Sequence, residues 1–221
     1  DHLVNDYRYP RAQTRVIPNP VRLERFSGLD LTRGAASPGR VLVLGRISAR
    51  KGLEDVIALA ARLRDAGSDA RIRVVGGPSL WSDYTALLAD LPPQSSEFAG
   101  RIEPAHIPAE LARTDVLLQP AKYEPFGLTV GEALAAGVPV VATSETGAVE
   151  GIDRRVAAEL APGDVAGMAA AIELTLERLR ADPAGLRTLA HEEAARRFAP
   201  ELVCEQLSLA LERIVEEFEG R

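Results

Sequence analysis

The chain has 221 residues, of which 46% are hydrophobic and 26% charged, as in globular proteins of one α/β domain or two small ones. Its formal net charge of −6 gives no general electrostatic reason to bind nucleic acid or an anionic membrane. The single cysteine, Cys204, excludes an intramolecular disulfide and a cysteine-rich zinc site.

Cysteine usage, hydropathy and the first residue indicate where the protein resides and whether the sequence is part of a longer one. One cysteine suits a reducing compartment, and no apolar run approaches the roughly 20 residues of a spanning helix. We therefore expect a cytoplasmic protein, or one that lies peripherally at the inner face of the membrane in its full-length form. The chain opens with Asp1 rather than Met, so we expect it to be a piece of something longer.

Residues 1–40 differ in composition from the rest of the chain. They are rich in Arg and Pro and end in GAASPG, which favours the end of a preceding domain followed by a linker. The arginines of this segment are interpreted as solvated linker residues rather than as a nucleic-acid patch; they are Arg8, Arg11, Arg15, Arg22 and Arg25.

From residue 41 onward, short aliphatic runs alternate with longer amphipathic ones. The runs predict strands at 41–44, 71–75, 97–98, 115–120, 138–143 and 156–160, and helices at 53–66, 82–91, 110–113, 183–198 and 201–219. A further helix follows the loop at 123, with Gly137 as the residue just past its end. This pattern indicates an α/β fold, a Rossmann-like open parallel sheet with helices on both faces over residues 41–199 and appended C-terminal helices.

The last helix, within residues 200–221, has an apolar stripe of its own. Leu207, Leu211, Ile214 and Phe218 recur at helical spacing. The stripe either packs on its own domain, or it meets a partner domain or subunit. In the second case the helix crosses to a missing N-terminal domain, and it can drive self-association of this chain.

GRISARKG, residues 45–52, stands directly between the first predicted strand and the first predicted helix. In open parallel sheets, ligands bind beyond the carboxyl ends of the strands. Gly45 lets the backbone approach a ligand, and the helix start offers free N–H groups. Arg46 and Lys51 add a planar fork and a point charge, which suit a diphosphate. The alternative is a solvated basic loop.

YEPFGLTVGEALAAG, residues 123–137, follows the strand predicted at 115–120. Glu124 lies in the loop and Glu132 inside the following helix, and a carboxylate at such a position accepts hydrogen bonds from sugar hydroxyls. The amides of Phe126, Gly127, Leu128 and Thr129 stand at the helix start, where an anion is favoured. The alternative is one acid that complements the helix dipole and one surface acid.

Several motifs in a fixed order resemble one known family. GRISARKG, EPFGLTVGE and the later LAPGD are similar to the C-terminal, donor-binding half of retaining glycosyltransferases of family 4, the group with two Rossmann-like domains (the GT-B fold). VIPNPVRLERF is similar to the segment that precedes this domain in the family. EPFGLTVGE fits the E-x7-E motif of that family, and Gly45-Arg46 with Lys51-Gly52 fits its GR…KG motif. The resemblance covers roughly residues 14–180.

The resemblance implies a role for each matching residue. Arg46 and Lys51 would hold the diphosphate of a nucleotide sugar as leaving group, and Glu124 with the Phe126-Gly127 backbone would bind the transferred sugar. The remaining implied contacts are the Leu128 and Thr129 amides with phosphate, Glu132 with the ribose, and Arg101 and Ile102 with the base. The family retains anomeric configuration, uses no metal and no cofactor besides its donor substrate, and has no settled protein nucleophile.

Two stretches depart from the family pattern. Residues 146–150 read TGAVE where the family commonly has two glycines before its glutamate, although Gly147 can still be the residue of close approach. Ala121 replaces the serine that commonly precedes the first motif glutamate, which changes the wall that faces the sugar.

The resulting hypothesis is the donor-binding domain of a glycosyltransferase that moves a sugar from a UDP- or GDP-linked donor to an acceptor hydroxyl. The acceptor, which would be a sugar, a lipid or a small molecule, would bind through a missing N-terminal domain. The alternative is a nucleotide-sugar-binding module without activity of its own. An NAD-binding domain is disfavoured because no GxGxxG follows a strand.

Overall fold

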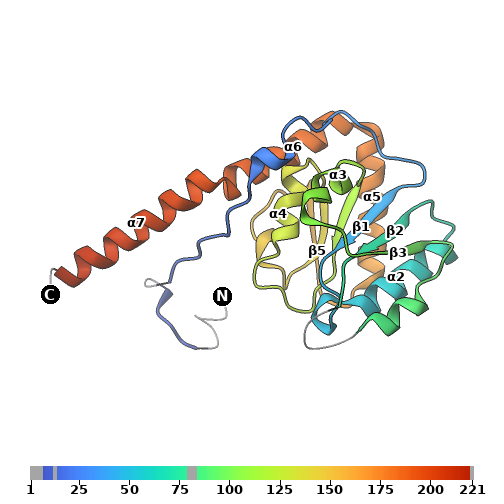
Figure 1. Ribbon diagram of the computed structural model, residues 1–221, viewed down its shortest axis with the longest axis horizontal. Helices are drawn as coiled ribbons and strands as arrows, with labels where there is room; N and C mark the ends of the chain where they lie inside the picture. Colours follow the sequence, from blue (N-terminus) through green and yellow to red (C-terminus); the bar gives the residue numbers. More distant parts are fainter. Residues whose placement is uncertain (1–6, 12–13, 79–83, 220–221) are drawn as a thin grey trace.

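The computed structural model describes residues 7–11, 14–78 and 84–219, and it shows one six-stranded parallel sheet (Figure 1). The strand order is β3-β2-β1-β4-β5-β6. The strands are β1 (Arg40–Leu44), β2 (Arg71–Val75), β3 (Ser96–Gly100), β4 (Val116–Gln119), β5 (Val140–Thr143) and β6 (Ala157–Leu160). The predicted Rossmann-like open sheet is therefore confirmed, and the order reverses between β1 and β4, where such folds bind ligands.

Helices cover both faces of the sheet. On one face, α2 (Leu53–Asp65) and α5 (Val165–Ala181) share a core with Val41 and Ile72. On the other face, α3 (Ile107–Ala112), α4 (Leu128–Ala135) and α6 (Pro183–Phe198) share a core with Leu42 and Leu117. Successive strand residues therefore enter opposite cores, which explains why the strands are almost continuously apolar.

Two helices differ from the sequence-based prediction. Residues 85–90 form η4 (Thr85–Asp90), a 3-10 helix rather than the α-helix predicted at 82–91, whose first two residues lie outside the described part. Pro92 and Pro93 prevent a helix from continuing past this short segment. Helix α5 is absent from the prediction, although Asp164 caps it by accepting from the Gly167 amide at 2.8 Å.

The predicted end of α4 is confirmed at Gly137. This glycine has φ +72°, its amide donates to the Leu134 carbonyl at 2.9 Å, and the Val138 amide donates to the Ala133 carbonyl at 2.8 Å. These two bonds form a Schellman motif, which satisfies carbonyls that the last turn leaves free. The chain thereby turns directly from α4 into β5.

Part of the segment expected to be a linker packs against the domain. Val21 and Phe26 are each only 2% exposed and belong to the core beneath α4, and η2 (Leu23–Phe26) carries the second of them. The Val21 amide also donates to the Phe198 carbonyl at the end of α6, at 2.7 Å. The Arg- and Pro-rich composition of residues 1–40 conceals these two apolar anchors.

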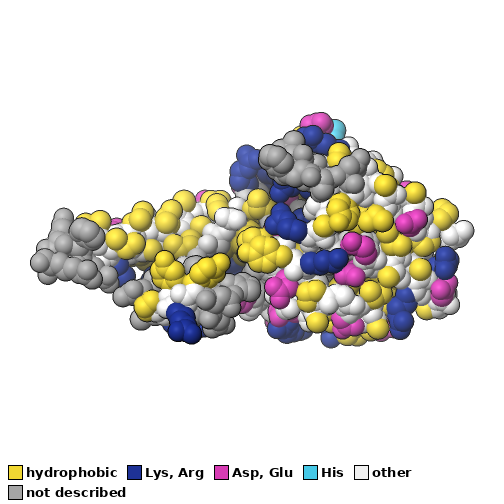
Figure 2. Space-filling model, turned by 90° about the horizontal axis from the view of Figure 1, so that it is seen from below, with side chains coloured by type: hydrophobic (Ala, Val, Ile, Leu, Met, Phe, Trp, Pro, Cys, Tyr) yellow, Lys and Arg dark blue, Asp and Glu magenta, His cyan; other side chains and the backbone are white. Residues whose placement is uncertain are grey.

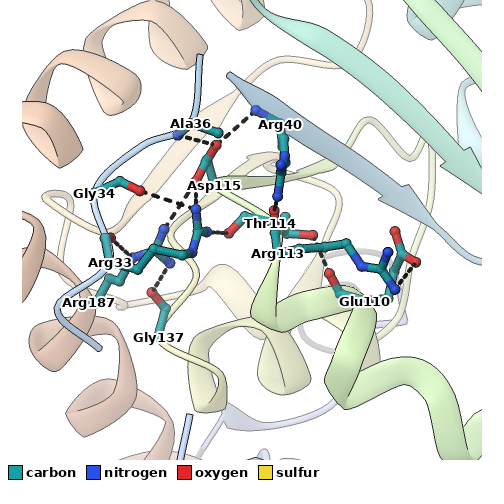
Figure 3. Close-up of polar contacts among 10 residues, drawn as sticks. All are labelled: Arg33, Gly34, Ala36, Arg40, Glu110, Arg113, Thr114, Asp115, Gly137 and Arg187. Atoms are coloured by element: carbon teal, nitrogen blue, oxygen red, sulfur yellow. Dashed lines mark hydrogen bonds and ion pairs between the residues drawn. The ribbon is translucent and has the colours of Figure 1, made fainter. Parts of the chain in front are cut away.

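A buried ionic cluster joins residues 33–40 to the sheet and to α6 (Figure 3). Asp115 is fully buried at the start of β4, and Arg187 of α6 is 2% exposed. The carboxylate of Asp115 accepts from four donors: Arg33 Nη1 at 2.8 Å, Arg187 Nη2 at 3.2 Å, the Ala36 amide at 3.0 Å and the Arg40 amide at 2.9 Å. Burial lowers the pKa of Arg187 to about 10, and Asp115 opposes this shift.

Helix α7 (Pro200–Glu219) extends away from the domain (Figure 1), and hydrophobic side chains lie along this extension (Figure 2). Leu207, Leu211 and Ile214 of the predicted stripe are exposed by 48%, 54% and 58%, whereas the side chain of Phe218 lies outside the described part. The three described residues of the stripe are therefore largely exposed rather than packed on their own domain. Among the described helices, none is both long and apolar enough to cross a membrane.

Candidate functional site

The predicted site residues lie at the carboxyl edge of the sheet, on loops and in the first two turns of α4. The loop after β1 contains GRISARKG, the loop after β4 contains Glu124, and the loop after β5 contains Gly147. Since β1 pairs with β4 and β4 pairs with β5, the three loops are neighbours. Parallel pairing alone thus gathers residues that lie up to about a hundred positions apart.

The GRISARKG loop is fixed at both ends. The Ile47 side chain is 5% exposed, and its amide donates to the Gly77 carbonyl at 2.8 Å. At the other end Gly52 adopts φ +67° and begins α2, and a Cβ at this position would lie 2.0 Å from the Pro120 carbonyl oxygen. Only glycine fits there, because both the left-handed conformation and the close approach to the chain after β4 exclude a side chain.

The two motifs predicted separately meet in an ion pair. Lys51 Nζ contacts Glu124 Oε2, and the two side chains are 19% and 16% exposed. The Lys122 amide also donates to the Arg50 carbonyl at 2.8 Å, so the backbones of the two loops are joined beside the pair. A lysine and a glutamate therefore stand together, partly shielded from water, at the switch point between β1 and β4.

Arg46 lies on the same loop but is exposed, and its side chain makes no hydrogen bond or ion pair with any residue that the structure describes. Its planar group of five donors is therefore available to an anion. Arg101 is also exposed, just past the end of β3, and its side chain lies beside Gly77. Ile102 is partly buried against the core, which limits what it can offer to a ligand.

Backbone hydrogen bonds connect the Glu124 loop to the loop after β5. The Glu124 amide donates to the Glu145 carbonyl at 2.9 Å, the Gly147 amide to the Glu124 carbonyl at 3.1 Å, and the Ala148 amide to the Phe126 carbonyl at 2.7 Å. A Cβ at Gly147 would lie 2.3 Å from the Pro125 carbonyl oxygen. Gly147 is thus a residue of close approach, and what it approaches here is the loop that carries Glu124.

Helix α4 begins directly after the Glu124 loop, beside its hydrogen bonds to the loop after β5. Gly127, with φ +97°, is its N-cap, and no side chain caps the helix. The first amides of a helix have no partner inside it, and they carry the positive end of its dipole. Leu128 is 51% exposed at this position, so its amide lies where a ligand could reach it.

Glu132 occupies the second turn of α4 and has a partner that the sequence analysis missed. Its Oε1 accepts from Arg25 Nη1 at 3.1 Å, and Arg25 Nη2 donates to the Pro104 carbonyl at 2.6 Å. Burial raises the pKa of Glu132, and the charge of Arg25 opposes the rise. The interpretation of Arg25 as a solvated linker residue is therefore wrong. Neighbouring Phe26, an apolar residue that needs burial, was the available signal.

An open groove runs beside the site. It has a volume of about 1210 Å³ and is lined by residues 16–19 and 123–126, by parts of the 144–150 loop, by the end of α6 and by Gln206 of α7. Glu124, Phe126 and Gly147 all line it, and the ring of Phe126 packs edge-on against Phe198 at 5.6 Å between centroids. The groove gives a ligand of small-molecule size access to the carboxyl edge. Within the described residues, no group of three or more His, Cys, Asp or Glu is placed to hold a metal ion.

Comparison with known proteins gives consistent results. The family described as "Glycosyl transferases group 1" matches residues 38–178. The chain is 34% identical over 176 residues to a glycogen synthase of Mycobacterium tuberculosis, covering 78% of this chain and 41% of that protein. It is also 34% identical over 165 residues to the 2-deoxystreptamine glucosyltransferase of Streptomyces kanamyceticus, covering 74% of this chain and 41% of the relative.

Solved structures show the same fold. A sucrose-phosphate synthase from Thermosynechococcus elongatus superimposes with a TM-score of 0.74 at 23% identity, over 97% of this chain and 56% of that one. Anabaena HepE, solved in complex with UDP and glucose, superimposes with a TM-score of 0.74 at 24% identity, over 90% of this chain and 56% of its own. The chain thus spans about two fifths of the length of the two curated relatives named above.

Proposed function

Because the chain belongs to the group 1 glycosyltransferases, we propose that it is the donor-binding half of a retaining enzyme of family 4. The whole enzyme would transfer a sugar from a UDP- or GDP-linked donor to an acceptor hydroxyl. The acceptor would bind between this domain and an N-terminal domain, at the groove beside Glu124. The observation that carries the proposal is the Lys51–Glu124 ion pair at the switch point of the sheet.

The ion pair suggests how the donor is received. Without ligand, Lys51 and Glu124 neutralise each other while they are only 19% and 16% exposed. A diphosphate would be a stronger partner for Lys51 than Glu124 is, and the guanidinium of Arg46 on the same loop can also bind the diphosphate. Glu124 is then released to accept hydrogen bonds from hydroxyls of the transferred sugar.

The same cations would assist the reaction. Negative charge develops on the diphosphate as the bond to the sugar breaks, and positioned positive groups lower the barrier of such a step. Lys51 and Arg46 would supply that charge, together with the amides of Leu128 and Thr129 at the start of α4. We propose a reaction that needs no metal ion, so that a chelator leaves nucleotide binding unchanged.

The contacts of the ribose, the base and the transferred sugar are proposed from the positions of the remaining site residues. Glu132 keeps one carboxylate oxygen beyond the one that Arg25 engages, and this oxygen would accept from the ribose. Arg101 and Ile102, past the end of β3, would flank the base. Phe126 and Gly127 would meet the sugar through their backbone, since Gly147 and its loop hold that segment in place.

The central test is calorimetric titration of the chain with UDP, GDP and ADP. At least one should bind, and Lys51→Ala should weaken it about 10- to 150-fold, the range for loss of a hydrogen bond to a charged group. Lys122→Ala is the matched control, because Lys122 is a lysine only two positions before Glu124 in the sequence. Its side chain is 50% exposed and pairs with Glu54 at 3.4 Å. No binding at millimolar concentrations, or equal losses in both variants, would refute the assignment.

A second candidate is a nucleotide-sugar-binding module without activity of its own. The two candidates are distinguished by turnover, because both would bind a nucleotide sugar. Hydrolysis or transfer of sugar from a nucleotide sugar by this chain alone would exclude the module. Binding without turnover, restored to turnover by an added N-terminal half, would support the donor-binding half of an enzyme.

A further inference from the structure

Three buried side-chain polar atoms lack a hydrogen-bond partner among the described residues, and all three lie at the carboxyl edge of the sheet. They are Asp55 Oδ2 in the first turn of α2, Gln119 Nε2 at the end of β4, and Thr129 Oγ1 in the first turn of α4. Buried polar groups are almost always paired, and violations concentrate where a protein meets a ligand.

Gln119 is the most informative of the three. Asp55 and Thr129 stand in first turns of helices, where unpaired backbone amides are neighbours. Gln119 is the last residue of a central strand, its side chain is 2% exposed, and an amide nitrogen buried there without an acceptor destabilises the fold. A hydrophobic residue of similar size would suit that strand better. Core packing therefore does not explain a glutamine at this position.

A small cavity adjoins Gln119. It has a volume of about 20 Å³, and its lining includes Gly45, Arg46, Ser48 and Lys51 of the GRISARKG loop. A polar cavity needs roughly 10–15 Å³ to hold one water, together with two to four polar partners. The cavity thus has room for one water molecule but not for a phosphate group, and Ser48, Arg46 and Lys51 are polar residues of its lining.

We propose that Gln119 is a positioning residue of the donor site and acts through one water. The inference rests on the proposed function. With a nucleoside diphosphate bound, Gln119 Nε2 donates a hydrogen bond to a water in this cavity, and the water donates one to an oxygen of the diphosphate held by Arg46 and Lys51. A bridging water is nearly as favourable as a direct hydrogen bond. The diphosphate thereby supplies the acceptor at the end of a hydrogen-bond chain that begins at Gln119.

The test is the variant Gln119→Met, which keeps the length of the side chain and removes its donor. Because Gln119 Nε2 has no hydrogen-bond partner among the described residues, the melting temperature of the free variant should change little. The dissociation constants of the best-binding nucleoside diphosphate and of inorganic pyrophosphate should both rise about tenfold. Gln94→Met, at an exposed glutamine before β3 on the opposite edge, should change neither quantity.

The possible outcomes are separable. If the wild type binds a nucleoside diphosphate and Gln119→Met binds it equally well, the water bridge is refuted while the proposed function stands. If the free variant melts several degrees lower, Gln119 has a structural partner and the inference is also overturned. If the wild type binds neither nucleotide nor pyrophosphate, the proposed function fails and the bridge fails with it.

Discussion

Removal of the Asp115 carboxylate should lower the stability of the fold, because this carboxylate holds residues 33–40 and α6 to the sheet. Asp115→Ala deletes the acceptor of four hydrogen bonds or ion pairs, two of them from the backbone amides of Ala36 and Arg40. It leaves Arg187, which is 2% exposed, with the carbonyls of Arg33 and Gly137 as its hydrogen-bond partners within the described part of the chain. The variant therefore buries an uncompensated positive charge.

The expected magnitude follows from that charge. Removing one partner of a buried ion pair typically costs about 3–5 kcal/mol, out of a total stability of about 5–15 kcal/mol for a domain. The pKa of Arg187, already lowered to about 10 by burial, should fall further without Asp115. Asp69→Ala is the control, since Asp69 pairs with Arg180 at 3.0 Å and both side chains are more than 40% exposed. That surface pair should contribute about 0–1 kcal/mol.

Urea denaturation followed by circular dichroism measures both variants against the wild type at neutral pH. The account predicts a loss of about 3–5 kcal/mol for Asp115→Ala and of at most about 1 kcal/mol for Asp69→Ala. A double variant, Asp115→Ala with Arg187→Met, should recover part of the loss because no buried charge is left unpaired. Equal losses in the two single variants would refute the reasoning.

Three further changes have defined outcomes. Gly67 has φ +69° with open space around it, so Gly67→Ala should lower the free energy of unfolding by about 1–2 kcal/mol. Gly52→Ala should lower it further, because its Cβ would also lie 2.0 Å from the Pro120 carbonyl oxygen. Equal losses of stability in urea denaturation would contradict the importance of that contact. Burial raises the pKa of Glu132, so its contribution to stability is present below the unfolded pKa of about 4.5 and is lost as pH rises through the folded value. The stability of the wild type relative to Glu132→Gln should accordingly fall as the pH rises above about 4.5, and a relative stability that rises over this change would contradict the prediction. The exposed stripe of α7 should drive self-association at high concentration that Leu211→Lys abolishes, whereas a monomer at all concentrations by light scattering would exclude it.

The fold could be predicted largely from local sequence. Apolar runs located the central strands most clearly, because β4 and β5 are buried at every residue and so read as continuously hydrophobic. The edge strand β3 leaves Glu97 and Phe98 exposed, and its sequence gives a correspondingly weaker signal. The end of α4 could be predicted from Gly137 alone, since only glycine adopts φ +72° there without strain. Helix α5 could have been predicted from Asp164 and from the spacing of Met168, Ile172 and Leu176, which local reasoning did not use.

The candidate site could be predicted only in part. The positions of Lys51 and Glu124 followed from the motifs, but their ion pair joins residues 73 positions apart and depends on the packing of two loops. The contact between Arg25 and Glu132 spans 107 positions, and the composition of the N-terminal segment pointed away from it. The missing hydrogen bond of Gln119 is likewise a tertiary property, because a glutamine in a strand carries no sign of whether its amide is paired.

The most direct test of the central claim is to locate the bound nucleotide by ¹H–¹⁵N NMR titration of the chain with UDP or GDP. The account predicts that amide shifts change in the loop of Gly45 to Gly52, at Gly127 to Thr129 and around Gly147, and not at Arg40, Arg71 or Ser96 on the opposite edge of the sheet. Shifts confined to the opposite edge, or none at millimolar ligand, would contradict a donor site at the carboxyl ends of β1 and β4.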